Sequence, residues 1–252
     1  MSVDLQHVLL SAIAAGLGLL ACGPARAQTP DWQDLESRIQ YGYYTEDVRS
    51  VQGVIQMLAP AAPDALKSYY AGLANYRLAL LSGPNDRHRT KEAAANCVDS
   101  LDHALELRKD FADALALQSA CLDVLATLEP LRAPFAASRS GSQIEKARHL
   151  EPKNPRVLLL GAVSDYQRVK ATPAQRQQAR SELQRAAESF EAERQDINHV
   201  PGWGTADVYL YIARCRLDDG NALAARDALE RALLIAPEFM QARRLMKTIT
   251  SG

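Results

Sequence analysis

Apolar and small residues recur along most of the chain at the spacing of one face of an α-helix. Within residues 91–108, for example, Cys97, Leu101, Ala104 and Leu105 fall on one stripe. Clusters of glycine, proline and serine interrupt the pattern, because these residues favour turns over helix interiors. The sequence predicts an all-α protein with a loop over residues 130–142 and helices over about residues 30–43, 45–58, 63–81, 91–108, 112–128, 144–150, 154–170, 173–193, 207–217, 223–234 and 238–248.

The carboxyl-terminal part of the chain carries a regular spacing of small residues. Ala225 follows Ala213 by twelve positions, Leu229 and Ala232 lie four and seven beyond Ala225, and Pro237 lies five beyond Ala232. Small residues let two antiparallel helices approach closely, the leucine fills the space between them, and proline ends the second helix. This segment resembles the tetratricopeptide-repeat family. The resemblance implies a right-handed α–α superhelix, a solenoid that binds other molecules through a groove.

The repeats, aligned on the small residue of each second helix, fall at Ala104, Ala147, Ala186 and Ala232. Their intervals of 43, 39 and 46 residues exceed the roughly 34 residues of a tetratricopeptide repeat. We therefore expect four to five irregular hairpins, with extra residues in loops such as the one around Ser138. Residues 147–204 also resemble exported bacterial helical-repeat proteins, through the patterns N-P-R-V, T-P and P-x-W-G.

Residues 1–27 are typical of a signal peptide, although the leader before residue 8 lacks Lys and Arg. Residues 8–21 are uninterruptedly apolar or small but too few to span a bilayer comfortably, and residues 25–27 form an A-x-A cleavage site. An overlapping alternative is a lipobox that ends at Cys22, whose acylation would give an outer-membrane lipoprotein. We predict a single solenoid domain over residues 28–252 in the periplasm, either soluble or lipid-anchored.

Export to an oxidising compartment makes the cysteines candidates for a disulfide. Cys97 lies thirteen residues before the turn expected near Asp110, and Cys121 lies eleven residues after it. Antiparallel helices rise equally from a shared turn, so the two sulfur atoms should lie at a similar height. We predict a Cys97–Cys121 disulfide, with two buried thiols as the alternative, and an unpaired Cys215.

Charge and motifs argue against several classes of function. The formal net charge of the 252-residue chain is −1, so no overall field favours nucleic acid or an anionic membrane. The histidines form no H-E-x-x-H motif, no cysteine pair has zinc-ligand spacing, and no phosphate-binding loop or G-x-S-x-G motif occurs. We expect no enzymatic activity, no metal, no cofactor, and membrane contact only through a lipid anchor.

Two local clusters have both a structural and a functional interpretation. Residues 87–91, Arg-His-Arg-Thr-Lys, form either a solvated basic loop or a contact for an acidic partner or a glycan phosphate. Tyrosines in the first third of the chain are either packing residues or an interaction surface. They are Tyr41, Tyr43, Tyr44, Tyr69, Tyr70 and Tyr76.

Two functions from different classes remain. The resemblance implies a non-enzymatic envelope scaffold that holds a protein or peptide in a groove, and a lipidated form would assist outer-membrane assembly. The alternative is a periplasmic small-ligand-binding protein with a closed helical pocket. An open groove would favour the first function, and an enclosed apolar cavity the second. Candidate groove residues are polar side chains of the first helices: Asn75, Tyr76, Gln118, Asp165 and Arg214.

Overall fold

The computed structural model describes residues 31–59, 64–167, 172–194 and 200–250. Residue contacts divide the chain into two units, Met1–Pro30 and Asp31–Gly252, and the described residues all belong to the second unit. The predicted signal peptide, including Cys22, lies outside the described residues.

Helices make up the regular structure of the described residues, among which there is no strand. The all-α prediction is therefore confirmed, and α5 and α8 have the predicted bounds. The helices are α1 (Trp32–Tyr44), α2 (Val48–Leu58), α3 (Ala65–Ser82), α4 (Arg87–Leu107), α5 (Ala112–Leu128), α6 (Ala133–Leu150), α7 (Pro155–Gln167), α8 (Pro173–Glu193), α9 (Thr205–Asp218), α10 (Ala222–Ile235) and α11 (Met240–Thr250), with a 3₁₀ helix, η1 (Gly83–Asn85), between α3 and α4.

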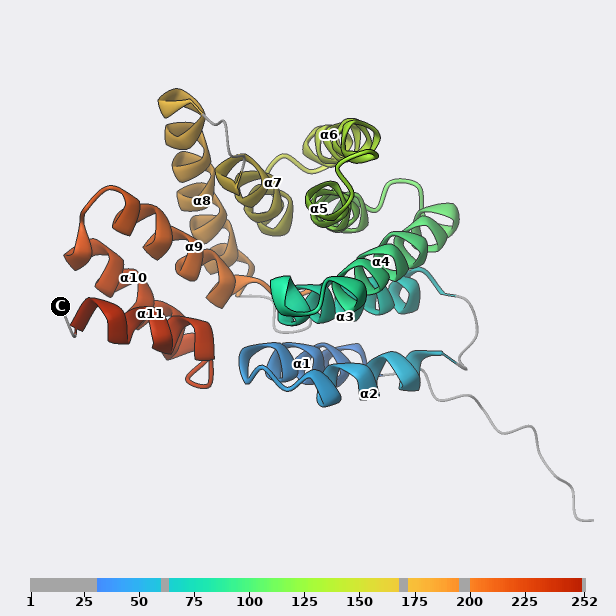
Figure 1. Ribbon diagram of the computed structural model, residues 1–252, viewed down its shortest axis with the longest axis horizontal. Coiled ribbons are helices and arrows are strands. Elements are labelled where there is room, and N and C mark those ends of the chain that lie inside the picture. Colours follow the sequence, from blue (N-terminus) through green and yellow to red (C-terminus); the bar gives the residue numbers. More distant parts are fainter. Residues whose placement is uncertain (1–30, 60–63, 168–171, 195–199, 251–252) are drawn as a thin grey trace, which may run out of the picture. The chain divides into compact units, whose positions relative to one another are not determined.

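Consecutive helices pair as hairpins, α1 with α2, α3 with α4, α5 with α6, α7 with α8 and α9 with α10, while α11 packs on α10 (Figure 1). The first helices of neighbouring hairpins also contact one another, α1 with α3, α3 with α5 and α5 with α7. This stacking defines an α-helical solenoid of five hairpins and a terminal helix, in agreement with the four to five hairpins predicted.

Aspartate side chains start the first four helices. Asp31, Asp47, Asp64 and Asp86 each accept hydrogen bonds from backbone amides of the helix that follows. An aspartate at this position satisfies amides that have no partner within the helix. Asp86 explains why α4 begins four residues before the predicted start at residue 91.

The chain turns in the same way after three of the second helices, α4, α6 and α10. The C-cap residue, four positions after the small alanine, donates its amide to that alanine's carbonyl group. The amide three residues later then donates to the carbonyl group of the C-cap residue. These pairs are Arg108 to Ala104 and Phe111 to Arg108, Glu151 to Ala147 and Asn154 to Glu151, and Ala236 to Ala232 and Phe239 to Ala236. The repeat is thus present in the backbone hydrogen bonds.

The small residues that define the predicted repeat are buried. Ala104, Ala147, Ala186, Ala213, Ala225, Leu229 and Ala232 all have 0% of their surface exposed. Pro237 is exposed and lies two residues beyond the end of α10. Small side chains at the helix contacts allow the close approach that stacking requires.

The loop predicted over residues 130–142 is wrong, because α6 extends back to Ala133. Pro134 falls in the first turn of α6, where a missing amide hydrogen breaks no helical bond. The Ser140 hydroxyl lies against α5 and donates to Asp123 at 2.6 Å. Tertiary contacts to α5 therefore stabilise a helix that composition alone disfavours.

The first and last parts of the array are in contact. The aromatic rings of Tyr44 and Phe239 lie 4.4 Å apart between centroids, Gln241 donates to the Tyr43 hydroxyl at 3.4 Å, and Arg244 pairs with Glu46. The residues that precede α11 and α11 itself therefore pack against the end of α1.

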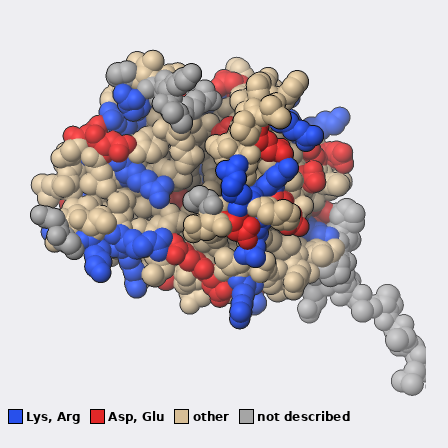
Figure 2. Space-filling model, viewed as in Figure 1, with Lys and Arg blue, Asp and Glu red and all other residues tan. Residues whose placement is uncertain are grey.

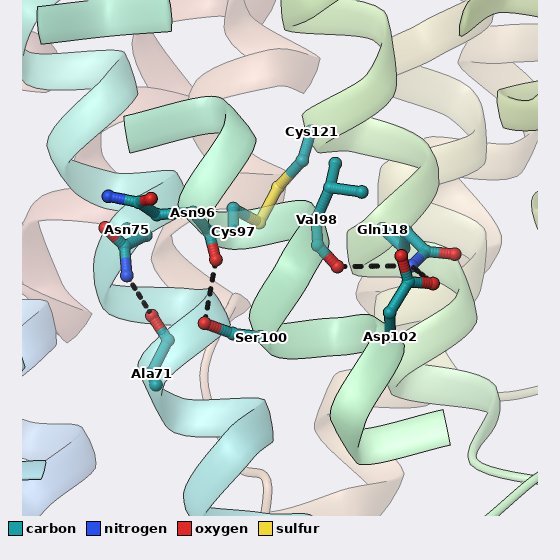
Figure 3. Close-up of a disulfide and its surroundings, with 9 residues drawn as sticks. All are labelled: Ala71, Asn75, Asn96, Cys97, Val98, Ser100, Asp102, Gln118 and Cys121. Atoms are coloured by element: carbon teal, nitrogen blue, oxygen red, sulfur yellow. Dashed lines mark hydrogen bonds between the residues drawn. A yellow bond between two sulfur atoms is a disulfide. The ribbon is translucent and has the colours of Figure 1, made fainter. Parts of the chain in front are cut away.

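A disulfide joins Cys97 of α4 to Cys121 of α5, the pairing that the sequence predicts (Figure 3). The Cα atoms are 6.3 Å apart, and both residues are fully buried. The bond closes a loop of 24 residues and fixes the second hairpin against the third.

Replacing both cysteines with alanine should lower the free energy of unfolding by about 2–4 kcal/mol, because the unfolded chain regains the freedom that the closed loop removes. Denaturant unfolding in oxidising buffer measures the difference, and alanine leaves no polar group in the buried site. Wild-type protein reduced by dithiothreitol should unfold like the variant. Equal stability of oxidised wild type and variant would contradict the prediction.

Candidate functional site

The inner faces of α1, α3 and α9 meet at a buried ion pair. The Arg77 guanidinium donates to both carboxylate oxygens of Asp207, at 2.8 Å and 2.9 Å, and its Nε donates to Gln40 at 3.0 Å. Arg77 and Asp207 are 2% and 3% exposed. Burying two charges is tolerated here because the guanidinium and the carboxylate form two parallel hydrogen bonds and Nε has a third partner.

Aromatic side chains enclose this ion pair. The Arg77 guanidinium lies 4.0 Å from the ring centroid of Tyr43 and 4.9 Å from that of Trp203, and the Tyr44 hydroxyl donates to Asp207 at 3.0 Å. Burial is the largest single effect on Arg77 and acts against its charge, but Asp207, Tyr43 and Tyr44 together outweigh burial and raise the pKa of Arg77. Burial, together with Asp207, holds the pKa of Tyr44 well above its usual range, so its hydroxyl remains a proton donor.

Very little empty space remains around the ion pair. A cavity of about 10 Å³ is lined by Tyr76, Leu159, Val163, Tyr211 and neighbouring side chains. A volume of this size holds at most one water molecule. The side chains around the ion pair are therefore packed and leave no room for a ligand there.

The five predicted groove residues do not form one surface. Tyr76 lines the small central cavity, and Arg214 donates to Gln241 at 3.1 Å. Asn75 is 5% exposed and bonds within its own helix to Ala71, while fully buried Gln118 donates to Asp102 at 2.8 Å (Figure 3). Asp165 accepts from Arg148 at 3.4 Å. These interactions use Asn75 and Gln118 in the packing of the protein.

Groups that commonly carry chemistry are dispersed over the described residues. His88, His103 and His149 are exposed, and no group of three or more His, Cys, Asp or Glu in that part of the chain could hold a metal ion. Cys215 is buried, which raises the pKa of its thiol to about 11. Among the described helices, none has the length and apolarity needed to cross a membrane.

A groove lies between α1 and α2, with a volume of about 460 Å³. We call it the α1–α2 groove; its lining residues are Ser37, Arg38, Tyr41, Ser50, Gly53, Val54 and Met57. Tyr41 is 58% exposed and Met57 is 55% exposed. A Cβ atom added at Gly53 would meet nothing within 4 Å. The sequence indicated that the tyrosines of this region could form an interaction surface. It did not show that Tyr41 is exposed while the other five are buried.

A second groove lies between α8, α9 and α10, with a volume of about 240 Å³. Its lining includes small alanines and charged residues of both signs, which are Glu188, Glu191, Asp227, Arg216 and Arg231. Charges of both signs are also interspersed over the face shown in Figure 2. The second groove therefore has no single charge that would select a ligand.

Glu36 of α1 links two other segments to its helix. Its carboxylate accepts hydrogen bonds from the Tyr70 hydroxyl at 2.9 Å and from the Gly202 amide at 3.0 Å. Burial raises the pKa of Glu36 above its ordinary value of 4.5, against the opposing effect of these hydrogen bonds. The folded protein thus binds a proton at Glu36 more tightly than the unfolded chain does.

Asp207→Asn should lower the free energy of unfolding by about 3–5 kcal/mol, because Arg77 would keep its buried charge without a counter-charge. Asp34→Asn is the matched control, since the Arg38–Asp34 pair is about half exposed, at 56% and 55%. Its effect should stay below about 1 kcal/mol. Chemical denaturation of both variants measures the two changes in the free energy of unfolding. Equal changes would contradict the prediction that the buried pair contributes more to stability than the exposed pair.

Glu36→Gln should change how stability depends on pH. Because the folded pKa of Glu36 is raised, its contribution to stability is complete below pH 4.5 and is lost as the pH rises through the folded pKa. The amide cannot ionise, so the melting temperature of the variant should gain on that of wild type as the pH rises from 4.5. Thermal unfolding across this range tests the prediction, which a constant difference would contradict.

No family model matches the chain, and no curated protein matches it in sequence. The HusA haemophore from Porphyromonas gingivalis is similar in structure, with a TM-score of 0.57 and 18% identity over 75% of this chain and 94% of that chain. The assembly chaperone of RpL4, Acl4, has a TM-score of 0.39 and 13% identity over 88% of this chain and 96% of that chain. The first likeness supports the all-helical fold alone, and the second overlap is too low to support an inference.

Proposed function

We propose that the protein is a non-enzymatic, tetratricopeptide-like scaffold of the bacterial envelope that holds a protein or peptide partner in the α1–α2 groove. The observation that carries the proposal is the contrast between the packed centre, with about 10 Å³ of space, and this open groove of about 460 Å³. Export to the periplasm belongs to the same proposal and rests on the signal-peptide pattern of residues 1–27.

The residues that line the α1–α2 groove suit a protein partner. Tyrosine, methionine and arginine are enriched at protein interfaces, and Tyr41, Met57 and Arg38 supply all three here. The groove also belongs to the first described hairpin, where a terminal repeat needs a polar outer face to remain soluble. An apolar hollow in this position is explained if a partner covers it. The partner we expect is a segment that places an apolar side chain between Tyr41 and Met57.

Gly53→Gln should abolish partner binding without weakening the fold. The added side chain points into open space at Gly53 and would occupy the groove. Glutamine also favours the helix over glycine by about 0.5 kcal/mol. Gly141→Gln in α6 is the matched control, because an added Cβ there also meets nothing within 4 Å.

The measurement is site-specific photo-crosslinking from position 41 in cells, followed by affinity purification and mass spectrometry. One envelope protein should be captured reproducibly by the otherwise unchanged chain and by Gly141→Gln, and lost with Gly53→Gln. Its affinity for the purified chain should fall at least about tenfold in Gly53→Gln, in keeping with loss of a central interface contact. Capture that is indifferent to Gly53→Gln would refute the groove as the binding site.

A flat apolar ligand such as haem is the second candidate for the same groove. Its volume of about 460 Å³ lies within the range of about 300–1,000 Å³ seen for small-molecule sites. Tyr41 and Met57 are residue types that serve as axial ligands of haem iron, and Arg38 could pair with a carboxylate. The similarity to a haemophore motivates the test but supplies only the fold. This second candidate differs from the small-ligand function expected from the sequence, because the ligand would lie in an open groove and not in a closed pocket.

Haemin titration followed by absorption spectroscopy separates the two candidates. Haem binding through Tyr41 should give a shifted Soret band that Tyr41→Phe removes and Gly141→Gln retains. An unshifted spectrum at equimolar haemin would remove the small-ligand candidate and leave the protein-partner proposal in place.

A further inference from the structure

Two large apolar side chains project from the turn between α5 and α6. Leu131 lies in the turn and is 96% exposed, and Phe135, in the first turn of α6, is 81% exposed. Leu131 precedes the N-cap residue Arg132, and Phe135 follows it by three residues, so both lie at the start of α6. We call this turn, residues 129–135, the α5–α6 corner. Two large apolar side chains this exposed within one short turn indicate a candidate interaction surface.

Basic residues from α4 lie against the α5–α6 corner. The Arg87 guanidinium donates to the carbonyl oxygen of Leu128 at 3.1 Å, and the Lys91 ammonium pairs with Glu129 at 2.5 Å. Arg132 lies within the corner beside Leu131. Lys91, through its hydrogen bond, and Arg132, through its charge, lower the pKa of Glu129. The fold thus brings Arg87 and Lys91, two of the basic residues over positions 87–91, to the end of α5 beside the corner.

The charge next to the corner is positive on balance. Arg87, Lys91 and Arg132 contribute three positive charges, and Glu129, which Lys91 and Arg132 influence, contributes one carboxylate. The next charges outward form neutral pairs, Arg89 with Asp86 and Arg139 with Asp102. Glu92 follows Lys91 and points about 100° away from it around α4. The corner therefore has two apolar side chains, Leu131 and Phe135, beside a cationic margin formed by Arg87, Lys91 and Arg132. The formal net charge of the whole chain, in contrast, is −1.

We propose that the α5–α6 corner is a membrane-docking site, which places Leu131 and Phe135 in the interface of an anionic phospholipid bilayer while Arg87, Lys91 and Arg132 meet the headgroups. A projecting apolar pair needs a soft surface, whereas a protein partner would need a matching cavity. Apolar side chains and basic residues together favour such interfaces. Two side chains give only weak, reversible binding, so the corner would orient a protein that a second signal, such as acylated Cys22, holds at the membrane.

The test is co-sedimentation of the purified chain with phosphatidylglycerol vesicles. Leu131→Ser/Phe135→Ser should lower the partition coefficient about a hundredfold, since each buried side chain of this size contributes about a factor of ten or more. The matched control is Leu223→Ser/Leu234→Ser in α10, whose side chains are 72% and 81% exposed. All variants share the same amino-terminal segment, so differences between them report on the corner alone.

The cationic margin has its own test. Arg87→Gln/Arg132→Gln should weaken binding to phosphatidylglycerol vesicles, leave binding to phosphatidylcholine vesicles unchanged, and reduce the salt dependence. Circular dichroism of each variant checks that the helices are intact. Equal partition coefficients of wild type and Leu131→Ser/Phe135→Ser would overturn the proposal. An equal decrease of the partition coefficient in Leu223→Ser/Leu234→Ser would also overturn it. Gly53→Gln should partition like wild type, so failure of the α1–α2 groove and failure of the corner are distinguishable.

Discussion

The buried ion pair of Arg77 and Asp207 constrains how helices from distant parts of the sequence meet. Neither charge can be buried alone, so α3 and α9, whose paired residues are 130 positions apart, must meet with both hydrogen bonds formed. Tyr44 at the end of α1 contributes the donor that completes the carboxylate's partners. Helices from three hairpins are therefore fixed relative to one another by one network, while apolar packing supplies the bulk of the stability.

Local signals allowed much of the solenoid to be predicted. Ala104, Ala147 and Ala232 could be found because the close contacts that require them recur at fixed distances from a turn. Arg77 could not be recognised, because its partner lies in α9 and no spacing in the sequence links the two. Gln118 looked like a groove residue, but α4 and α5 pack closely enough to bury it. The start of α6 was missed because its serine, glycine and proline content disfavours a helix that contacts with α5 stabilise.

The packed centre moves the search for function to the outside of the array. Trp203 donates from its indole to the Tyr69 hydroxyl at 2.7 Å, and both side chains are buried. Five of the six early tyrosines are likewise used in the core, and only their shared preference for helix contacts was visible in the sequence. Tyr41 differs because it lies on the outer side of α1. The exposure of Tyr41, next to the free space at Gly53, depends on how α1 and α2 pack. It could not be predicted from the composition of the sequence.

The two proposed surfaces differ in how the fold holds them. At the corner, α4 contacts the end of α5 through Arg87 and Lys91, and the Cys97–Cys121 disulfide ties the same two helices farther along. A surface fixed at two points loses little conformational entropy on docking. Less of the free energy of the weak apolar contacts is therefore cancelled, and these contacts contribute to the affinity. The α1–α2 groove is closed at one end by a turn in which the Asp47 amide donates to Gly42 at 2.8 Å. Gly42 lies against Val51, where an added Cβ would come within 2.9 Å, so the close approach of α1 to α2 sets the width of the groove.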